Sequence, residues 1–388
     1  MRSFAVAYMA VLALLTALGV LGAYRLYESF GPDDAAEAAA DDHAYDFLSW
    51  EVEHFPRKWI YKVRHIFDGR TAAEEESALQ KYFNAEGEAA DNEADVEEII
   101  EGRITAILED QGLEMDLPLF SDLGLVFPPV DFELDAPPRV LAVSPRDRIE
   151  LEHSLLLEPG LGREQFEAIE REAESENGPE TGVSAVVVGT GGVATYPAVV
   201  SSSHPYERVV DTAFHEWVHQ YLAFYPLGRN YFAGSDLRTL NETAANLAGE
   251  ALAAEYFRRY PRLETEATPP PSTAPADPAE PVFDFTKEMR ELRGAVEEML
   301  AGGRIREAEA LMDAKRQELG QHGYNIRPLN QAYFAFHGSY ADTPGSIDPI
   351  GPLMQTLLER AGSAGAFVRL AAGITSRSDL DRVLAQAE

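Results

Sequence analysis

The sequence predicts an α+β protein that is mainly helical and carries a small sheet. Two observations give this class. Apolar residues recur at the spacing of a helix in several long segments. These helical segments are 205–222, 285–301, 304–320, 347–362 and 364–372. Other runs are rich in valine and have strand character. These runs are 140–144, 149–157, 183–189 and 193–200.

The best delimited helix contains His215-Glu216-Trp217-Val218-His219 and lies between Pro205 and Pro226. Two histidines four residues apart project from one face of a helix, one turn above the other. This geometry allows both imidazoles to bind one tetrahedral zinc ion. Glu216 follows the first histidine, where it can take a proton from the water that the metal activates. We therefore expect Zn²⁺ as the cofactor, with His215 and His219 as ligands and Glu216 as the catalytic base.

A third ligand is expected from the next helix. Asn241-Glu242-Thr243-Ala244-Ala245 begins that helix, and Glu242 lies 23 residues after His219. Small residues at 245, 248 and 249 would let the two helices pack closely. Glu242 is the natural third metal ligand, and Glu250 or Asp236 would have to replace it if it were not.

Two polar residues are candidates for holding the ligands in place. Asp211 lies one turn before His215 and could accept a hydrogen bond from a histidine N–H, although a solvated aspartate is an equal alternative. Asn241 directly precedes Glu242 and is the second candidate.

At this point the chain resembles a known family. His-Glu-x-x-His followed by Asn-Glu-x-x-Ala on a second helix resembles the gluzincin metallopeptidases, and more narrowly a bacterial aminopeptidase group. The resemblance covers residues 189–254 well and the C-terminal quarter loosely, and it departs from the group at Thr243, where a bulkier residue is usual. It implies a zincin-like catalytic core, a peptide substrate with a free amino terminus, and an edge strand beside the motif helix on which an extended substrate lies.

That edge strand is expected within a hairpin directly before the motif helix. The runs 183–189 and 193–200 are separated by Thr190-Gly191-Gly192 and predict two paired strands. A substrate backbone could add to such an edge, with Thr195 and Tyr196 as candidate substrate contacts. A hairpin with a purely structural role is an equal alternative.

A donor that stabilises the oxyanion is expected from the segment 330–340. If this segment is helical, Tyr333, His337 and Tyr340 fall at i, i+4 and i+7, and Asn330 joins the same face. We expect Tyr340 or His337 to be the donor, then Tyr333, with Asn330 as a candidate substrate contact. The alternative is an aromatic stripe that packs in the core.

The N-terminal segment predicts a membrane anchor. From Phe4 to Tyr24 there are 21 residues without a charge, which as a helix would span roughly 30 Å, the thickness of a bilayer core. A cleaved signal peptide is the competing interpretation, but the apolar run is long for one. We expect a single-pass membrane protein whose catalytic part lies outside the cytoplasm.

Charge and composition exclude several partners and ligands. The formal net charge of −34 argues against nucleic acid, because Coulomb repulsion would oppose every contact with phosphates. There is no cysteine, so the metal must be bound by nitrogen and oxygen atoms. Nothing in the sequence indicates a particular oligomeric state.

The expected organisation follows from these segments. It consists of a transmembrane or signal anchor at 1–24, an acidic tether at 25–45, an acidic helical region at 46–138, the zincin-like catalytic core at 139–264, a proline-rich loop or linker at 265–283, and a helical C-terminal region at 284–388.

The predicted function is zinc-dependent peptide hydrolysis by a membrane-tethered metallopeptidase, with aminopeptidase activity the first expectation. The alternative is a membrane-anchored binding or scaffold protein that retains a zinc site without catalysis. Glu216 distinguishes the two, since a closed structural site has no use for a carboxylate at that place. A helical protein with a coincidental motif is a third interpretation, which Glu242 and its helix disfavour.

Overall fold

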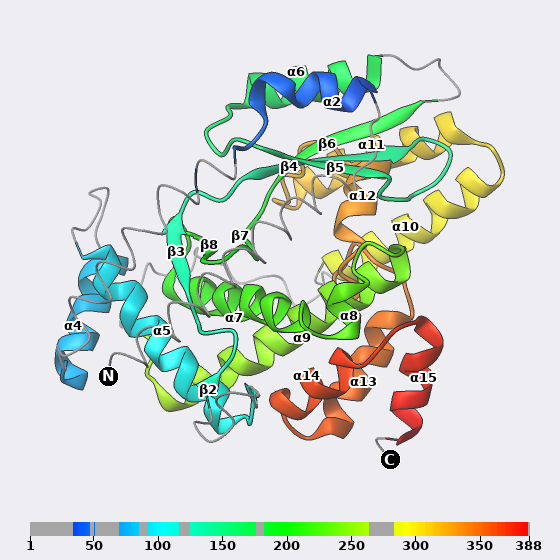
Figure 1. The fold of residues 1–388 in the computed structure, drawn as a ribbon. Helices are drawn as coiled ribbons and strands as arrows, with labels where there is room; N and C mark the ends of the chain where they lie inside the picture. The colour runs from blue at the N-terminus through cyan, green and yellow to red at the C-terminus, as the bar shows by residue number, and fades with distance from the viewer. Residues whose placement is uncertain are drawn as a thin grey trace, which may run out of the picture.

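The protein is an α+β molecule in which helices predominate (Figure 1). The predicted class, α+β and mainly helical, is therefore confirmed. A computed structural model describes residues 34–46, 50, 70–84, 92–115, 125–175, 182–263 and 283–386.

Helices occupy most of the described chain, and short strands lie between them. The helices are α2 (Asp34–Ala40), the 3-10 turn η1 (Asp41–His43), α4 (Ala72–Phe83), α5 (Glu93–Asp110), α6 (Arg163–Ser175), α7 (Tyr206–Leu222), α8 (Pro226–Arg229), α9 (Ser235–Arg259), α10 (Phe285–Ala301), α11 (Ile305–Gln321), α12 (Gln331–His337), α13 (Ile350–Ala361), α14 (Ala364–Ala372) and α15 (Arg377–Gln386). The strands are β1 (Glu114–Met115), β2 (Leu125–Val126), β3 (Phe132–Asp135), β4 (Arg139–Pro145), β5 (His153–Leu157), β6 (Val183–Gly189), β7 (Gly192–Val193) and β8 (Ala198–Ser201).

The largest hydrophobic core surrounds the crossing of α7 and α9. It also takes in α5, β3, β8 and the C-terminal helices α13 to α15. On α7 the buried side chains recur at the predicted helical spacing, among them Phe214, Trp217 and Val218. The core thus joins elements from both sides of the expected borders at residues 138 and 264.

The chain also forms two three-stranded sheets, of which the second contributes side chains of β3 and β8 to this core. In the first, with the order β5-β4-β6, all neighbours are antiparallel. In the second, β8 lies between its parallel neighbour β3 and its antiparallel neighbour β7, so β7 is an edge strand.

The predicted hairpin between 183–189 and 193–200 is wrong in its pairing. β6 pairs along its full length with β4, whereas β8 pairs with β3 and β7. β4 offers β6 seven paired positions, from Arg139 opposite Gly189 to Pro145 opposite Val183. A shorter antiparallel pair, β7 with β8, does precede α7 directly.

Part of the expected acidic tether is packed structure. Residues 34–43 form α2 and η1, and Ala36, Ala39 and Ala40 are buried against α6. Alanine side chains are short enough to let two helices approach closely, so an alanine-rich segment can pack although it is acidic.

The acidic helix α5 is likewise part of the core. Its carboxylates Glu97 and Glu101 are buried and accept hydrogen bonds from the backbone N–H groups of Leu134 and Phe132 at 2.7 and 3.0 Å. Charged side chains here satisfy the outer edge of β3, which protects that edge from pairing with another chain.

The predicted transmembrane segment, residues 1–24, lies outside the described residues. Within the described ranges, no helix combines the length and apolar character needed to cross a membrane. The predicted proline-rich segment, 265–283, also lies outside the description, except for Phe283.

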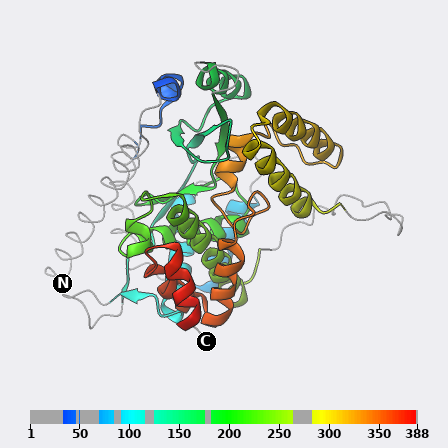
Figure 2. The ribbon, with the colours of Figure 1, turned by 90° about the vertical axis from the view of Figure 1, so that its right-hand side faces the viewer.

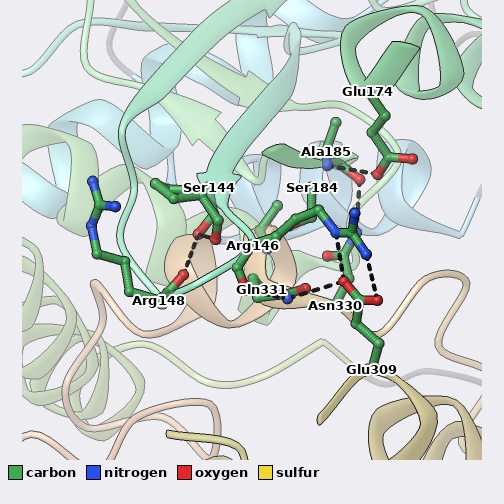
Figure 3. A network of polar contacts seen from close by, with 11 residues as sticks. Ser144, Arg146, Arg148, Glu174, Ser184, Ala185, Glu309, Asn330 and Gln331 are labelled. Atoms are coloured by element: carbon green, nitrogen blue, oxygen red, sulfur yellow. Dashed lines mark hydrogen bonds and ion pairs between the residues drawn. The ribbon is translucent and has the colours of Figure 1, made fainter. Parts of the chain in front are cut away.

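A polar network fixes the beginning of α12 on the first sheet (Figure 3). Asn330 donates to the Ala185 carbonyl at 2.9 Å, and Gln331 donates to the Arg146 carbonyl at 2.8 Å. Arg146 in turn forms two bonds of 2.7 Å with Glu309 of α11.

The hairpin of α10 and α11 lies beside α12 and apart from α13 to α15 (Figure 2).

Candidate metal centre

Two histidines of α7 and one glutamate of α9 converge where these helices cross. The Nε2 atoms of His215 and His219 lie 3.0 Å apart. Glu242 Oε2 lies 3.8 Å from the first of them and 3.3 Å from the second. The structure therefore brings together the three residues predicted to bind the metal.

Small residues on α9 permit this close crossing, as the sequence predicts. Ala245 and Ala248 are fully buried. A Cβ atom added to Gly249 would lie 3.2 Å from the backbone nitrogen of His215. Larger side chains here would push α9 away from α7 and Glu242 away from the histidines.

The spacing of the three ligand atoms fits a zinc ion. Tetrahedral ligands at zinc bond lengths of about 2.0–2.1 Å lie roughly 3.3 Å from each other, close to the 3.0, 3.3 and 3.8 Å observed. Glu242 Oε2 is buried and has no hydrogen-bond partner, which is costly unless a cation or proton satisfies it. Nitrogen and carboxylate oxygen are donors that zinc accepts, so the residues fit this metal.

The charges of the group favour a cation. Burial opposes ionisation of both His219 and Glu242, but their mutual attraction outweighs it, so that the pKa of His219 is raised and that of Glu242 is lowered. A metal ion would take the place of the proton that this pair attracts.

His215 and Glu216 both lie in surroundings that disfavour the charged form of their side chains. Burial, with the neighbouring His219, lowers the pKa of His215 to about 3, which keeps the ring in its neutral, metal-binding form. Burial also raises the pKa of Glu216 to about 8. A cation in the group would lower the pKa of Glu216 by Coulomb attraction and so make it available as a base.

Two tyrosines flank the group. Tyr231, from the loop after α8, donates a hydrogen bond to Glu242 Oε1, and its ring lies 6.4 Å from that of His219. The ring of Tyr340, predicted as an oxyanion donor, lies 6.3 Å from that of His215. Burial raises the pKa of both hydroxyls well above the usual value, so both stay protonated donors.

Two asparagines of α9 lie near the ligand group, and one of them contacts the outer nitrogen of His219. Asn241, predicted to hold a ligand in place, has its Oδ1 2.7 Å from Nδ1 of His219. Asn246, which the sequence analysis did not name, lies on the same helix and donates to Asp342 Oδ2 at 2.9 Å. The carboxylate of Asp211 pairs with Arg208 at 2.8 Å across one turn of α7, which agrees with the alternative of an aspartate on the helix surface.

The edge strand β7 lies beside the part of the α7 surface that contains Thr212 and Glu216. A Cβ atom on Gly192 would lie 2.7 Å from Glu216 Oε1 and 2.9 Å from Thr212 Cγ2, so only glycine fits beside the proposed base. One turn further along α7, Gln220 Nε2 donates to the Thr195 carbonyl at 2.5 Å. Thr195 itself is buried and bonds the Pro197 carbonyl, and Tyr196 is also buried.

The remaining predictions concern the segment 330–340 and the alternative ligands. α12 ends at His337 with Gly338 as its last cap, so Tyr340 is not on a common helix face with Tyr333 and His337. Tyr333 packs against the core of the α10–α11 hairpin. Asn330 caps α12 by accepting from the Tyr333 N–H at 2.9 Å. Glu250 and Asp236, the alternative ligands, are not in the group.

Sequence reasoning missed three residues around the ligands: Tyr231, Asn246 and Asp342. Asn246 lies four residues after Glu242 on the same helix, and this spacing could have identified it. No local pattern marks Tyr231 or Asp342, since both reach the site from loops.

Comparisons with known proteins give no family for this chain: no protein-family model matches it, and neither does any curated protein or solved structure.

Proposed function

We propose that the protein is a zinc-dependent peptidase whose reaction takes place between α7, α9 and β7. His215, His219 and Glu242 would hold the metal, which supplies a Lewis acid that activates water and polarises a peptide carbonyl. Glu216 accepts the proton of the attacking water and passes it to the leaving amine. The Tyr340 hydroxyl donates a hydrogen bond to the oxyanion that develops on the carbonyl.

The proposal rests on one observation. Three potential metal ligands lie together, and the carboxylate of Glu216, which is not one of them, is buried beside them. Among the described residues, the group contains His215, His219 and Glu242 and no fourth histidine or carboxylate. Catalytic zinc sites keep such an open position, whereas structural sites are closed by four protein ligands. The scaffold alternative gives no reason for Glu216 to be buried beside the group.

The edge strand β7 supports a peptide as the substrate. Gly192 and Val193 are half-buried and lie at the edge of their sheet, and Gly192 lies directly beside Glu216. An extended peptide that adds to this edge would present its backbone to the base and the metal. The preference for a free amino terminus and the membrane tether with the site outside the cytoplasm are parts of the proposal that rest on the sequence.

The first prediction concerns metal content and hydrolysis. The whole chain, purified in detergent and reconstituted with Zn²⁺, should retain about one zinc per chain and cleave a mixed peptide pool. His215→Ala should retain none. Absence of stoichiometric zinc in the wild type would remove the proposal. Equal cleavage of acetylated and free peptides would remove only the aminopeptidase assignment and leave an endopeptidase.

The second prediction concerns the oxyanion donor. Tyr340→Phe should lower the turnover number by about a hundredfold with little effect on zinc content, because only the transition state uses the hydroxyl. Tyr333→Phe is the matched control and should stay near the wild-type rate. If Tyr231→Phe shows the larger loss and Tyr340→Phe does not, Tyr231 is the donor.

A further inference from the structure

The α12–α13 loop, residues 338–349, is bound on one side to α9. The Ala341 N–H donates to Thr243 Oγ1 at 3.0 Å, and Asp342 Oδ2 accepts from Asn246 Nδ2 at 2.9 Å. Two consecutive residues of the loop are therefore attached to the helix that supplies the carboxylate ligand of the candidate metal centre.

The same loop brings Tyr340 to the candidate metal centre, where its ring lies 6.3 Å from that of His215. Thr343 keeps this part of the loop compact. Its Oγ1 lies 2.9 Å from the carbonyl oxygen of His337 and 2.8 Å from that of Tyr340. The place of the Tyr340 hydroxyl therefore depends on where the loop is held.

Arg293 of α10 joins the two ends of this part of the chain. Its Nη1 donates to the Phe334 carbonyl, in the last turn of α12, at 2.8 Å and to the Gly345 carbonyl at 3.3 Å. A Cβ atom on Gly338 would lie 2.8 Å from the same nitrogen. A glycine at this place thus lets the guanidinium group come close enough to bond both carbonyls.

The Arg293 side chain is itself held firmly between α10 and α12. It is 11% exposed, and its Nε donates to Glu297 Oε1 at 2.6 Å. Its guanidinium carbon lies 5.6 Å from the centre of the Phe334 ring. Removal of this donor would leave two carbonyl oxygens without it in a largely buried place, which favours rearrangement of the loop.

We propose that Arg293 is a positioning residue that acts through the α12–α13 loop to hold the Tyr340 hydroxyl where the oxyanion develops. This role rests on the proposed function, in which Tyr340 is the oxyanion donor. Arg293 contacts neither metal nor substrate in this scheme. A helix outside the expected catalytic core at 139–264 would then shape the reaction site.

The first test measures turnover, KM and zinc content of variants of the whole chain. Arg293→Met, which has no donor, should lower the turnover number about 10- to 100-fold and leave KM and zinc content nearly unchanged. The reason is that only the transition state uses the Tyr340 hydroxyl, and a displacement of about 1 Å can cost about a hundredfold. Arg293→Lys should retain most of the turnover, because one nitrogen makes both bonds and lysine offers such a donor.

A double variant shows whether Arg293 acts through Tyr340. Arg293→Met added to Tyr340→Phe should lower turnover by no more than about twofold beyond Tyr340→Phe alone, because the group that Arg293 positions is already lost. If the two losses multiply in full, Arg293 affects the reaction by another route and the inference is overturned.

Hydrogen exchange gives a readout that needs no activity. Arg293→Met should speed exchange of the loop amides, including the Ala341 N–H, at least about tenfold. Lys315→Met is the matched control. It removes ion pairs of 2.7 and 2.8 Å with Glu288 and Glu318 of the same hairpin, and it should change neither turnover nor exchange in the loop.

A folded Arg293→Met variant with wild-type turnover, or with wild-type exchange in the loop, overturns the inference and leaves the proposed function standing. Absence of hydrolysis by the zinc-loaded wild type overturns the proposed function and the catalytic role of Arg293 together.

Discussion

Glu216→Gln should keep about one zinc per chain and lower peptide turnover by about a thousandfold or more. Glutamine has nearly the same shape as glutamate but cannot accept the proton of the attacking water, and general-base catalysis contributes about 10²–10⁴-fold. A thousandfold corresponds to about 4 kcal/mol in the activation free energy. The substitution leaves the ligands in place, because Glu216 is not part of the group of three.

The measurement is the turnover number of the zinc-loaded variant, beside its zinc content. Glu250→Gln is a matched control, since Glu250 lies on the exposed side of α9 and outside the ligand group. It should retain both activity and zinc. A Glu216→Gln variant that hydrolyses peptides at the wild-type rate would assign the base to another residue.

Glu242→Ala should lose zinc altogether under dialysis and, with it, all hydrolysis. The change removes one of three ligands and the only negative charge among them, so the two imidazoles remain without the carboxylate that attracts a cation. Tyr231→Phe provides a graded comparison. It removes only the hydrogen bond to Glu242 Oε1 and should weaken zinc binding about tenfold without abolishing it.

Circular dichroism and thermal unfolding of the metal-free proteins establish that the Glu242→Ala variant is folded. If folded Glu242→Ala binds zinc as tightly as the wild type does, a carboxylate outside the present group must complete the site.

The sequence determined the parts of this protein that depend on short-range geometry. Residues four apart on a helix share a face whatever surrounds them, so His215 and His219 could be paired from their spacing alone. The apolar residues of α7 and the small residues of α9 also predicted which helix faces meet. Residues that are buried or closely packed on one face of a helix recur in the sequence at helical spacing. Glu242 followed from these two helices.

The same reasoning failed for the segment after Asn330. The expectation that Tyr333, His337 and Tyr340 share a face required one continuous helix, but α12 ends at His337. Gly338 follows it, where a Cβ atom would lie 2.8 Å from Arg293 Nη1. A contact with a distant helix therefore accompanies the end of this one, and Tyr340 lies beside His215 from the following turn.

Only the tertiary structure decided strand pairing and the partners of the ligands. β6 and β8 lie close together in sequence, yet each pairs with a strand from an earlier part of the chain. Tyr231 and Asp342 reach the site from loops, where no periodicity relates a residue to its neighbours in space. Asp211, at good spacing from His215, instead pairs with Arg208. Local spacing fixes which side chains share one helix face, whereas contacts between elements depend on how the whole chain packs.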